Sequence, residues 1–294
     1  MEFVDKEIGK ERSHILLKNF LDRCKKIEPY PTDLYEAMKS DVEPDTAINP
    51  DRKSTYKLIL EQILTETSIS INMPYGEGYC SYCMRTIKAN DLHSTLEHVI
   101  PNKTKTSESY NQYYKVNTKL EKREMVFRDV FINRHHCNAS PFPHNVAYEN
   151  LVSSCDGSLP KGSQNHICCN GPRGDDYIPP LLFIPEIHEQ IKYKKSGIVI
   201  WSANDEVDKR ERFQVINKLN LNCDILRVVR LIWCYLAENN LTHQMDIKDK
   251  RRVIDILQSR SASYDIDMLN NFRNNNYWDI LEDYQYFNDK TRFS

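Results

Sequence analysis

The chain contains the segment Tyr79-Cys80-Ser81-Tyr82-Cys83, in which two cysteines are separated by two residues. Cysteines at this spacing lie on a tight turn and can direct both thiolates at one Zn²⁺ ion. Because a tetrahedral structural site has four ligands, two more are needed. We expect Cys155 and Cys169 to complete the site, with Cys168 as the alternative to Cys169.

Other cysteines and histidines leave alternatives open. Cys137 or His166 could replace one of the two later ligands, and Cys83 or Cys155 could instead be a small buried apolar residue. The remaining cysteines lie on helix-like stretches far from the cluster, and we expect them to be buried; they are Cys24, Cys223 and Cys234. The charged segment at residues 1–7 predicts a cytoplasmic protein, in which clustered cysteines favour metal over disulfides.

An acid–histidine pair follows the cysteine turn, in Glu97-His98-Val99-Ile100-Pro101. Hydrolysis of a phosphodiester needs an activated water, and a neutral histidine can take its proton. A neighbouring carboxylate can help to hold a hard cation such as Mg²⁺. Adjacent residues on a strand point to opposite faces, but this rule relaxes near a strand end, which Pro101 indicates.

Two asparagines later in the chain are candidate site residues. Asn150 precedes Leu151 in front of Cys155, and Asn170 lies in the segment Cys169-Asn170-Gly171-Pro172-Arg173-Gly174. An amide oxygen is a suitable ligand for Mg²⁺ or Mn²⁺.

This order of parts resembles the HNH endonuclease family, whose core is a ββα-metal finger. The resemblance implies that His98 is the general base and Glu97 a ligand of a catalytic Mg²⁺ or Mn²⁺. It implies that Asn150 orients the base and that Asn170 is a second ligand of that ion. Arg173 stands where the family often has lysine, which implies contact with phosphate.

After the finger, a Pro-Leu-Leu stretch leads to Glu186-Ile187-His188-Glu189-Gln190-Ile191, a hairpin, and then Ile216-Asn217-Lys218-Leu219-Asn220-Leu221-Asn222 with an arginine-bearing helix. By this succession, residues 76–236 resemble, more narrowly, the HNH nucleases of Septu-type and retron-associated anti-phage systems, which work beside an ATPase subunit. The resemblance implies a DNA-cleaving effector of antiviral defence with an ATPase partner. Between His98 and Asn150 the chain has a helix-like piece at residues 120–131. It also has a cluster, His135-His136-Cys137-Asn138, that resembles a second metal-binding signature; we favour a polar loop over a ligand role.

The predicted fold class is α+β, with a zinc-stapled HNH core at residues 74–178. A helical region at 1–73 precedes it, and a hairpin with helices follows at 179–294. The N-terminal region has a helical face of Ile15, Leu16, Phe20 and Leu21, then a loop from Pro29 to Pro50. A second amphipathic helix carries apolar residues at positions 56, 59, 60, 63 and 64.

The C-terminal region begins with a strand-like run from Pro179 to Pro185. A hairpin is predicted from residues 191–193 and 198–200. Asn204 and Asn222 are candidate caps of the next two helices. The second of these helices has a wide apolar stripe at positions 225, 226, 228, 229, 232, 233 and 236, which predicts a buried helix. The aromatic tail, residues 277–287, favours a packed terminal helix over an interaction surface.

The composition limits the function. The 294 residues are 40% hydrophobic and 28% charged, with a formal net charge of −2. This charge excludes a strongly basic, stand-alone nucleic-acid binder, so a nuclease of this type is expected to cut weakly alone. No apolar run approaches the length of a membrane span. Two alternatives to DNA cleavage remain: cleavage of RNA such as tRNA, and a zinc-stapled binding module without catalysis.

Overall fold

The computed structural model describes the chain except residues 3, 67–72, 100, 103–141, 144, 159–166, 175–177, 179–180, 184–186, 203–213 and 242–246. The described part is a mixture of helices with three small two-stranded antiparallel sheets. This confirms the α+β class. None of the described helices is both long and apolar enough to cross a membrane.

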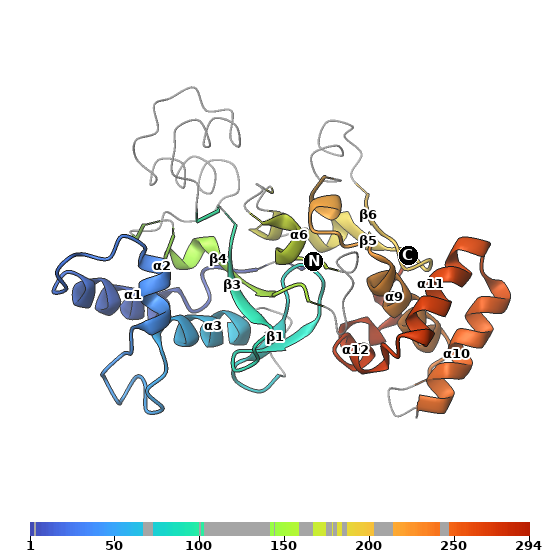
Figure 1. Cartoon of the computed structure of the whole chain (residues 1–294), viewed down its shortest axis with the longest axis horizontal. Coiled ribbons are helices and arrows are strands. Elements are labelled where there is room, and N and C mark those ends of the chain that lie inside the picture. The colour runs from blue at the N-terminus through green and yellow to red at the C-terminus, as the bar shows by residue number, and fades with distance from the viewer. Residues whose placement is uncertain are drawn as a thin grey trace, which may run out of the picture.

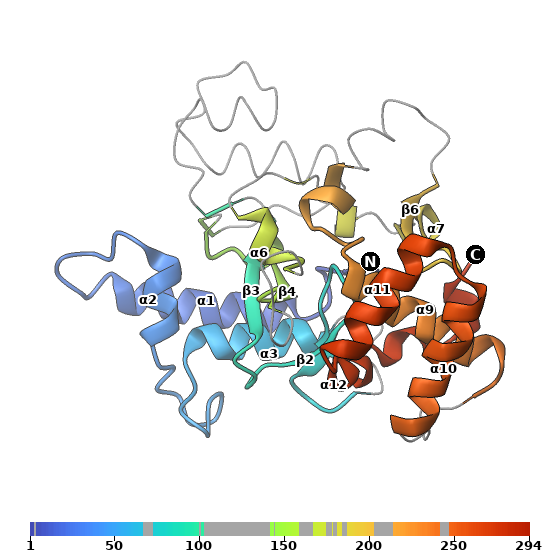
Figure 2. The ribbon, with the colours of Figure 1, turned by 45° about the vertical axis from the view of Figure 1, so that its right-hand side comes forward.

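The elements are arranged along one long axis (Figure 1). The N-terminal helices α1, α2 and α3 lie at one end, the strands β1 to β4 in the middle, and helices α9 to α12 at the other end (Figure 2). Buried apolar residues from all three parts form one continuous cluster. The cysteine-rich middle therefore shares its core with the helices on both sides.

Helix α1 (Lys10–Cys24) packs with a face slightly different from the predicted one. Its buried residues are Ser13, Leu16, Leu17, Phe20 and Cys24. Ile15 is 47% exposed, so its assignment to the buried face was wrong. Leu17, which is four positions after Ser13 and on the same side of the helix, lies on the buried face instead.

Helix α3 (Thr55–Glu66) confirms the second predicted helix, because Ile59, Leu60, Ile63 and Leu64 are buried. It lies against β1, β3 and β4 (Figure 1). The apolar side of this helix thus packs against the central strands.

Helix α2 (Leu34–Ser40) lies inside the segment that was predicted to be a loop. The Asp33 side chain accepts hydrogen bonds from the backbone N–H groups of Tyr35 and Glu36, which is an N-cap. Glu36 occupies the third helical position, where an acidic residue favours the helix start. This capping pattern outweighs the prolines around it, and the loop prediction was wrong there.

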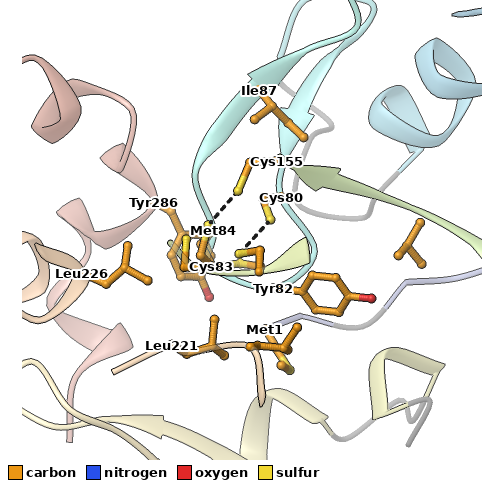
Figure 3. Packing of buried hydrophobic residues seen from close by; sticks show 14 of the residues in the cluster. Met1, Cys80, Tyr82, Cys83, Met84, Ile87, Cys155, Leu221, Leu226 and Tyr286 are labelled. Atoms are coloured by element: carbon orange, nitrogen blue, oxygen red, sulfur yellow. Dashed lines mark hydrogen bonds between the residues drawn. The ribbon is translucent and has the colours of Figure 1, made fainter. Parts of the chain in front are cut away.

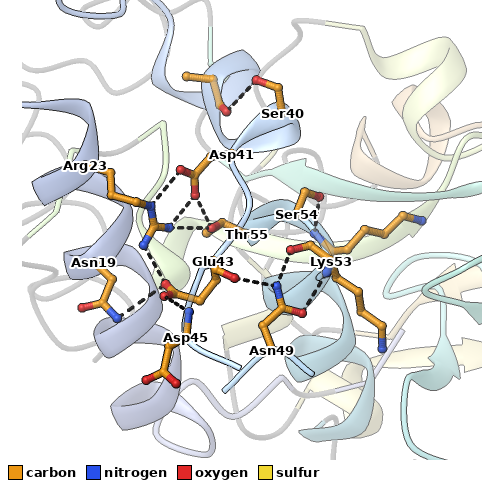
Figure 4. A network of polar contacts seen from close by, with 12 residues as sticks. Asn19, Arg23, Ser40, Asp41, Glu43, Asp45, Asn49, Lys53, Ser54 and Thr55 are labelled. Carbon is orange, nitrogen blue, oxygen red and sulfur yellow. Dashed lines mark hydrogen bonds and ion pairs between the residues drawn. The ribbon is translucent and has the colours of Figure 1, made fainter. Parts of the chain in front are cut away.

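A polar network fixes α2 against its neighbours (Figure 4). Both carboxylate oxygens of Asp41, just after α2, accept hydrogen bonds from the Arg23 guanidinium of α1, at 2.9 and 2.5 Å. Asp41 also accepts from the Thr55 hydroxyl at the start of α3, and Glu43 pairs with Arg23 at 2.8 Å. A bidentate pair of this kind fixes orientation as well as distance.

The middle of the chain supplies two antiparallel pairs. Strand β1 (Glu77–Tyr79) pairs with β2 (Thr86–Lys88), and the predicted cysteine turn lies between them. Strand β3 (Ser94–His98) pairs with β4 (Leu151–Cys155), so that Glu97 is opposite Val152 and His98 opposite Leu151. A short 3-10 turn, η2 (Tyr148–Asn150), leads into β4, and a short helix, α6 (Asn170–Arg173), follows it.

The C-terminal region starts with η4 (Leu181–Phe183), a 3-10 turn. The predicted strand was wrong at these residues, because flanking prolines lack the N–H groups that a strand ladder uses. The predicted hairpin is confirmed as β5 (Ile191–Tyr193) and β6 (Val199–Trp201), preceded by α7 (Ile187–Gln190).

The predicted buried helix is α9 (Asp224–Glu238), and its whole predicted stripe is buried. Asn222 does not cap it. The Asn222 amide instead pairs with both the N–H and the C=O of Val199 on β6. Asn204 lies outside the described residues.

Helices α10 (Ile247–Arg260), α11 (Ser263–Asn274) and α12 (Trp278–Glu282) follow α9, and the chain ends in η5 (Gln285–Asn288) and η6 (Lys290–Arg292). The tail aromatics Trp278, Tyr284 and Phe287 are almost fully buried. This confirms packing of the tail and leaves these rings no part in an external surface.

Candidate metal centre and adjoining pocket

Four buried cysteines converge between the β1–β2 hairpin, β4 and α6. They are Cys80, Cys83, Cys155 and Cys169, and their sulfurs all lie within 4.8 Å of one another. Figure 3 shows Cys80, Cys83 and Cys155 pointing into the same space. These are the four residues predicted first from the sequence.

The spacing of the sulfurs fits a tetrahedral ion. The Cys80 and Cys169 sulfurs are 3.7 Å apart, and those of Cys83 and Cys155 are 3.8 Å apart. Four sulfurs at a Zn–S distance of about 2.3 Å would be about 3.8 Å from each other. The cluster can therefore bind a metal ion such as zinc.

Backbone hydrogen bonds hold the cysteine turn in place. The Cys80 N–H donates to the Arg85 carbonyl, and the Met84 N–H to the Cys80 carbonyl, where Met84 has a positive φ of 66°. The Ser81 N–H donates to the Ser153 carbonyl on β4 at 2.9 Å. The turn is thus attached directly to the strand that carries Cys155.

The last ligand comes from a strained and closely packed segment. Cys169 has a φ of 55°, and its N–H donates to the Leu219 carbonyl. Gly157 has a φ of 79°, and a Cβ there would be 1.9 Å from the Cys168 carbonyl oxygen. Backbone strain of this kind persists only where its surroundings fix it. With this backbone the Cys169 sulfur joins the four-sulfur group, while the Cys168 thiol lies beside it and contacts Cys83 and Cys155.

The C-terminal tail also contacts the cluster. The Tyr284 hydroxyl donates to the Cys83 sulfur at 3.6 Å, and Arg85 beside the turn pairs with Asp283 at 2.9 Å. Groups of this kind around a metal site orient its ligands. The sequence alone offered no signal for Tyr284, because its contact spans 201 positions of the chain.

The thiols ionise unequally in this environment. Burial opposes ionisation of Cys83, but hydrogen bonds from neighbouring thiols outweigh it and hold its pKa well below the usual value. Burial and the same neighbours raise the pKa of Cys169 well above the usual value. Four thiolates together need a cation among them, which is the condition that Zn²⁺ meets.

A separate pocket of about 350 Å³ lies beside the cluster. It is lined by Glu97, His98 and Asn170, three of the four residues predicted to be catalytic. Glu97 and His98 both reach it although they are neighbours in β3, because the strand ends at His98. Asn170 reaches it from the first position of α6, one residue after the ligand Cys169.

His98 is buried, and its Nε2 lies 2.8 Å from the Asn145 carbonyl oxygen. A carbonyl only accepts, so Nε2 carries the proton and Nδ1 is the basic nitrogen. Burial lowers the pKa of His98 to about 4, and the Arg173 charge adds to this. The imidazole is therefore neutral at pH 7.

Arg173 has a different environment from the one expected of a phosphate ligand. Its guanidinium is buried, lies 2.6 Å from a Glu97 carboxylate oxygen and donates to the Val99 carbonyl at 2.9 Å. These contacts position Glu97 at the pocket. Contact of Arg173 with phosphate remains a prediction, as does the role of Glu97 as an ion ligand.

Asn150 is fully buried in η2 and does not line the pocket. Its carbonyl accepts from the Val99 N–H at 2.9 Å, one residue beyond His98. This backbone contact fixes the end of β3, while orientation of the base by the Asn150 amide remains a prediction. Cys137, His166, the cluster at 135–138 and the piece at 120–131 lie outside the described residues.

Three pocket residues come from the N-terminal helices and were not predicted: Tyr35, Lys39 and Tyr56. Tyr35 and Lys39 are four positions apart and so lie on one face of α2. The Asp33–Glu36 capping pattern was the signal that could have placed them on a helix.

Comparison of the chain with protein-family models, with curated proteins and with solved structures gave no match.

Proposed function

We propose that the chain is a metal-dependent endonuclease of the HNH type that hydrolyses DNA phosphodiester bonds. The observation that carries this proposal is the pocket in which Glu97, His98 and Asn170 meet beside a four-cysteine cluster. The chain order β3, β4, α6 supports it further, since a ββα element has this order. The resemblance of the motifs to the HNH family adds to these observations.

His98 is the general base of this proposal. Its Nε2 faces the Asn145 carbonyl, so that Nδ1 can accept the proton of an attacking water. The lowered pKa keeps the ring neutral at physiological pH and also makes it a weaker base than a free imidazole. The Tyr35 ring meets the imidazole edge to face, at 4.5 Å between centroids, and restricts its rotation.

Glu97 and Asn170 are the residues that would hold a catalytic Mg²⁺ or Mn²⁺. A carboxylate and an amide oxygen are the donor types that these ions prefer. Such an ion, when bound, would stabilise charge on the phosphate and on the leaving oxygen. The ion pair with Arg173 positions the Glu97 carboxylate at the pocket.

The proposed setting is an anti-phage defence complex with an ATPase subunit. Nonspecific affinity for nucleic acid comes mainly from cationic contacts to phosphate, and the net charge of this chain is −2. We therefore expect weak cutting by the isolated chain and stronger cutting in a complex.

The test is cleavage of plasmid DNA, single-stranded DNA and tRNA by the purified chain with Mg²⁺ or Mn²⁺. His98→Ala should lower the rate by roughly 10²- to 10⁴-fold while the chain stays folded and its zinc content is unchanged. Cleavage by His98→Ala at the wild-type rate would contradict the proposal. Cutting of tRNA alone would indicate an RNA nuclease. Nucleic-acid binding without any cleavage would indicate a zinc-stapled binding module.

A further inference from the structure

One wall of the pocket is formed by the N-terminal helices. Tyr35 and Lys39 come from α2, and Tyr56 comes from α3. The opposite side is formed by β3 and by Asn170 and Gly174 around α6. Segments more than 100 positions apart in the chain thus face one space.

The two tyrosines are fixed by the strand itself. The Tyr35 hydroxyl donates to the Leu96 carbonyl at 2.7 Å, and the Leu96 N–H donates to the Tyr56 hydroxyl at 2.8 Å. Leu96 directly precedes Glu97. The rings therefore hold a set position relative to the proposed catalytic pair.

Lys39 is held above these two rings. Its Nζ is 4.8 Å from the centroid of Tyr35 and 6.0 Å from that of Tyr56, which are cation–π distances. Its other contact is an ion pair with Glu36 at 2.7 Å, in which both side chains are more than 40% exposed. An exposed pair of this kind is weak, so a phosphate can displace the carboxylate.

Lys39 is also the one lysine or arginine among the described residues that line the pocket. Arg173, the cation expected there from the sequence, is buried against Glu97 and Val99. A nucleic-acid backbone entering the pocket would therefore meet the exposed Lys39 ammonium before the buried Arg173 guanidinium.

We propose that Lys39, positioned by the Tyr35 and Tyr56 rings, binds a phosphate of the nucleic-acid backbone next to the bond that is cleaved. This inference rests on the proposed nuclease function and adds a substrate contact to it. It makes the N-terminal helices part of the substrate-binding site as well as part of the core.

The test is binding of a fluorescein-labelled DNA duplex, and of the matching single strand, to the full-length His98→Ala chain at several salt concentrations. Adding Lys39→Gln should weaken binding roughly fivefold, the size expected for one exposed charge contact. It should also reduce the slope of log affinity against log salt by about 0.9 for duplex or about 0.7 for a single strand.

The matched control is Lys88→Gln, also in the His98→Ala chain. Lys88 is exposed and pairs with Glu77 at the same 2.7 Å, but it does not line the pocket. Lys88→Gln should leave the affinity and the salt slope unchanged. Lys39→Arg, which keeps the charge, should restore both. Unchanged melting temperatures would exclude misfolding as the cause.

The outcomes separate this inference from the nuclease proposal. If Lys39→Gln and Lys88→Gln have the same affinity and salt slope, the Lys39 assignment is overturned, whether or not the wild-type chain cuts. If binding depends on Lys39 but the wild-type chain cuts no nucleic acid with Mg²⁺ or Mn²⁺, the phosphate contact stands and the nuclease proposal fails.

Discussion

The cysteine cluster and the adjoining pocket are neighbours but opposite in character. The four cysteines of the cluster are at most 3% exposed, and their sulfurs already have the spacing of a four-coordinate ion. The pocket has a volume of about 350 Å³ and is lined by acidic, basic and amide side chains. A closed set of four ligands is typical of a structural metal site, while an open space with polar groups is typical of a reacting site.

The two sites also differ in where their residues come from. The cluster is made from the middle of the chain alone, between Cys80 and Cys169. The pocket needs β3, α6 and the N-terminal helices together. Cys169 and Asn170 are adjacent, so the same strained backbone delivers one residue to each site. The cluster and the pocket are therefore linked through the backbone of Cys169 and Asn170.

Loss of a metal ion bound by the cluster should have the largest effect. Zinc binding to a four-cysteine site contributes on the order of 10 kcal/mol. Cys83→Ser should therefore abolish metal binding and lower the melting temperature by at least about 10 °C. Metal analysis and thermal unfolding measure both effects.

Cys24→Ser is the matched control, because Cys24 is equally buried but far from the cluster in α1. It should keep the metal. A wild-type chain that contains no metal and melts at the same temperature with a chelator would contradict the assignment of the cluster.

Breaking the buried ion pair of Arg173 with the pocket residue Glu97 should have the next largest effect. Arg173→Met removes the guanidinium from the buried Glu97 carboxylate, which should cost about 3 to 5 kcal/mol in the free energy of unfolding. Urea unfolding measures this. Adding Glu97→Gln should recover part of the loss, because the buried charge is then gone.

Arg273→Met is the control for this pair. Arg273 and Asp255 are 2.7 Å apart, as close as Arg173 and Glu97, but both side chains are more than 40% exposed. Arg273→Met should lower the free energy of unfolding by less than about 1 kcal/mol. Equal losses for the two variants would show that burial does not distinguish them.

The pH dependence of stability should report on the burial of His98 within the pocket. The folded pKa of about 4 lies below the ordinary value of 6.5. Between these values the unfolded chain binds a proton that the folded chain does not, so acid favours unfolding. The contribution of the neutral His98 to the free energy of unfolding is fully present above pH 6.5. It falls by about 2 to 3 kcal/mol as the pH falls to 4.

The comparison of wild type with His98→Asn isolates this contribution, because acid also protonates the cysteines in both chains. Urea unfolding at pH 7 and near pH 4 should show a larger acid-induced loss for wild type than for His98→Asn. Parallel losses would mean that His98 is not buried as a neutral ring.

The sequence predicted those features that depend on short-range patterns. The apolar stripes of α3 and α9, the β5–β6 hairpin and the choice of Cys80, Cys83, Cys155 and Cys169 follow from spacing or local chemistry. The meeting of Glu97, His98 and Asn170 in one pocket was expected from the motif order, and the structure brings these three together.

The features that were missed depend on distant parts of the chain. The environment of Arg173 could not be predicted, because no spacing pattern links it to Glu97 in β3 or to Val99 just beyond that strand. Asn222 was expected to cap a helix, but the buried edge of β6 that does not pair with β5 is a stronger partner, with both an N–H and a C=O of Val199 to satisfy. Helix α2 was not predicted, because the prolines around it favoured a loop although Asp33 caps its start.

The hydroxyls of Tyr35 and Tyr56 have a consequence beyond the pocket. They occupy the backbone N–H and C=O of Leu96 on the edge of β3 that faces away from β4. A strand edge with unused backbone groups is a template for pairing with another chain. Without the first 73 residues, β3 would present such an edge to other copies. The N-terminal helices therefore also protect the chain against self-association through this strand.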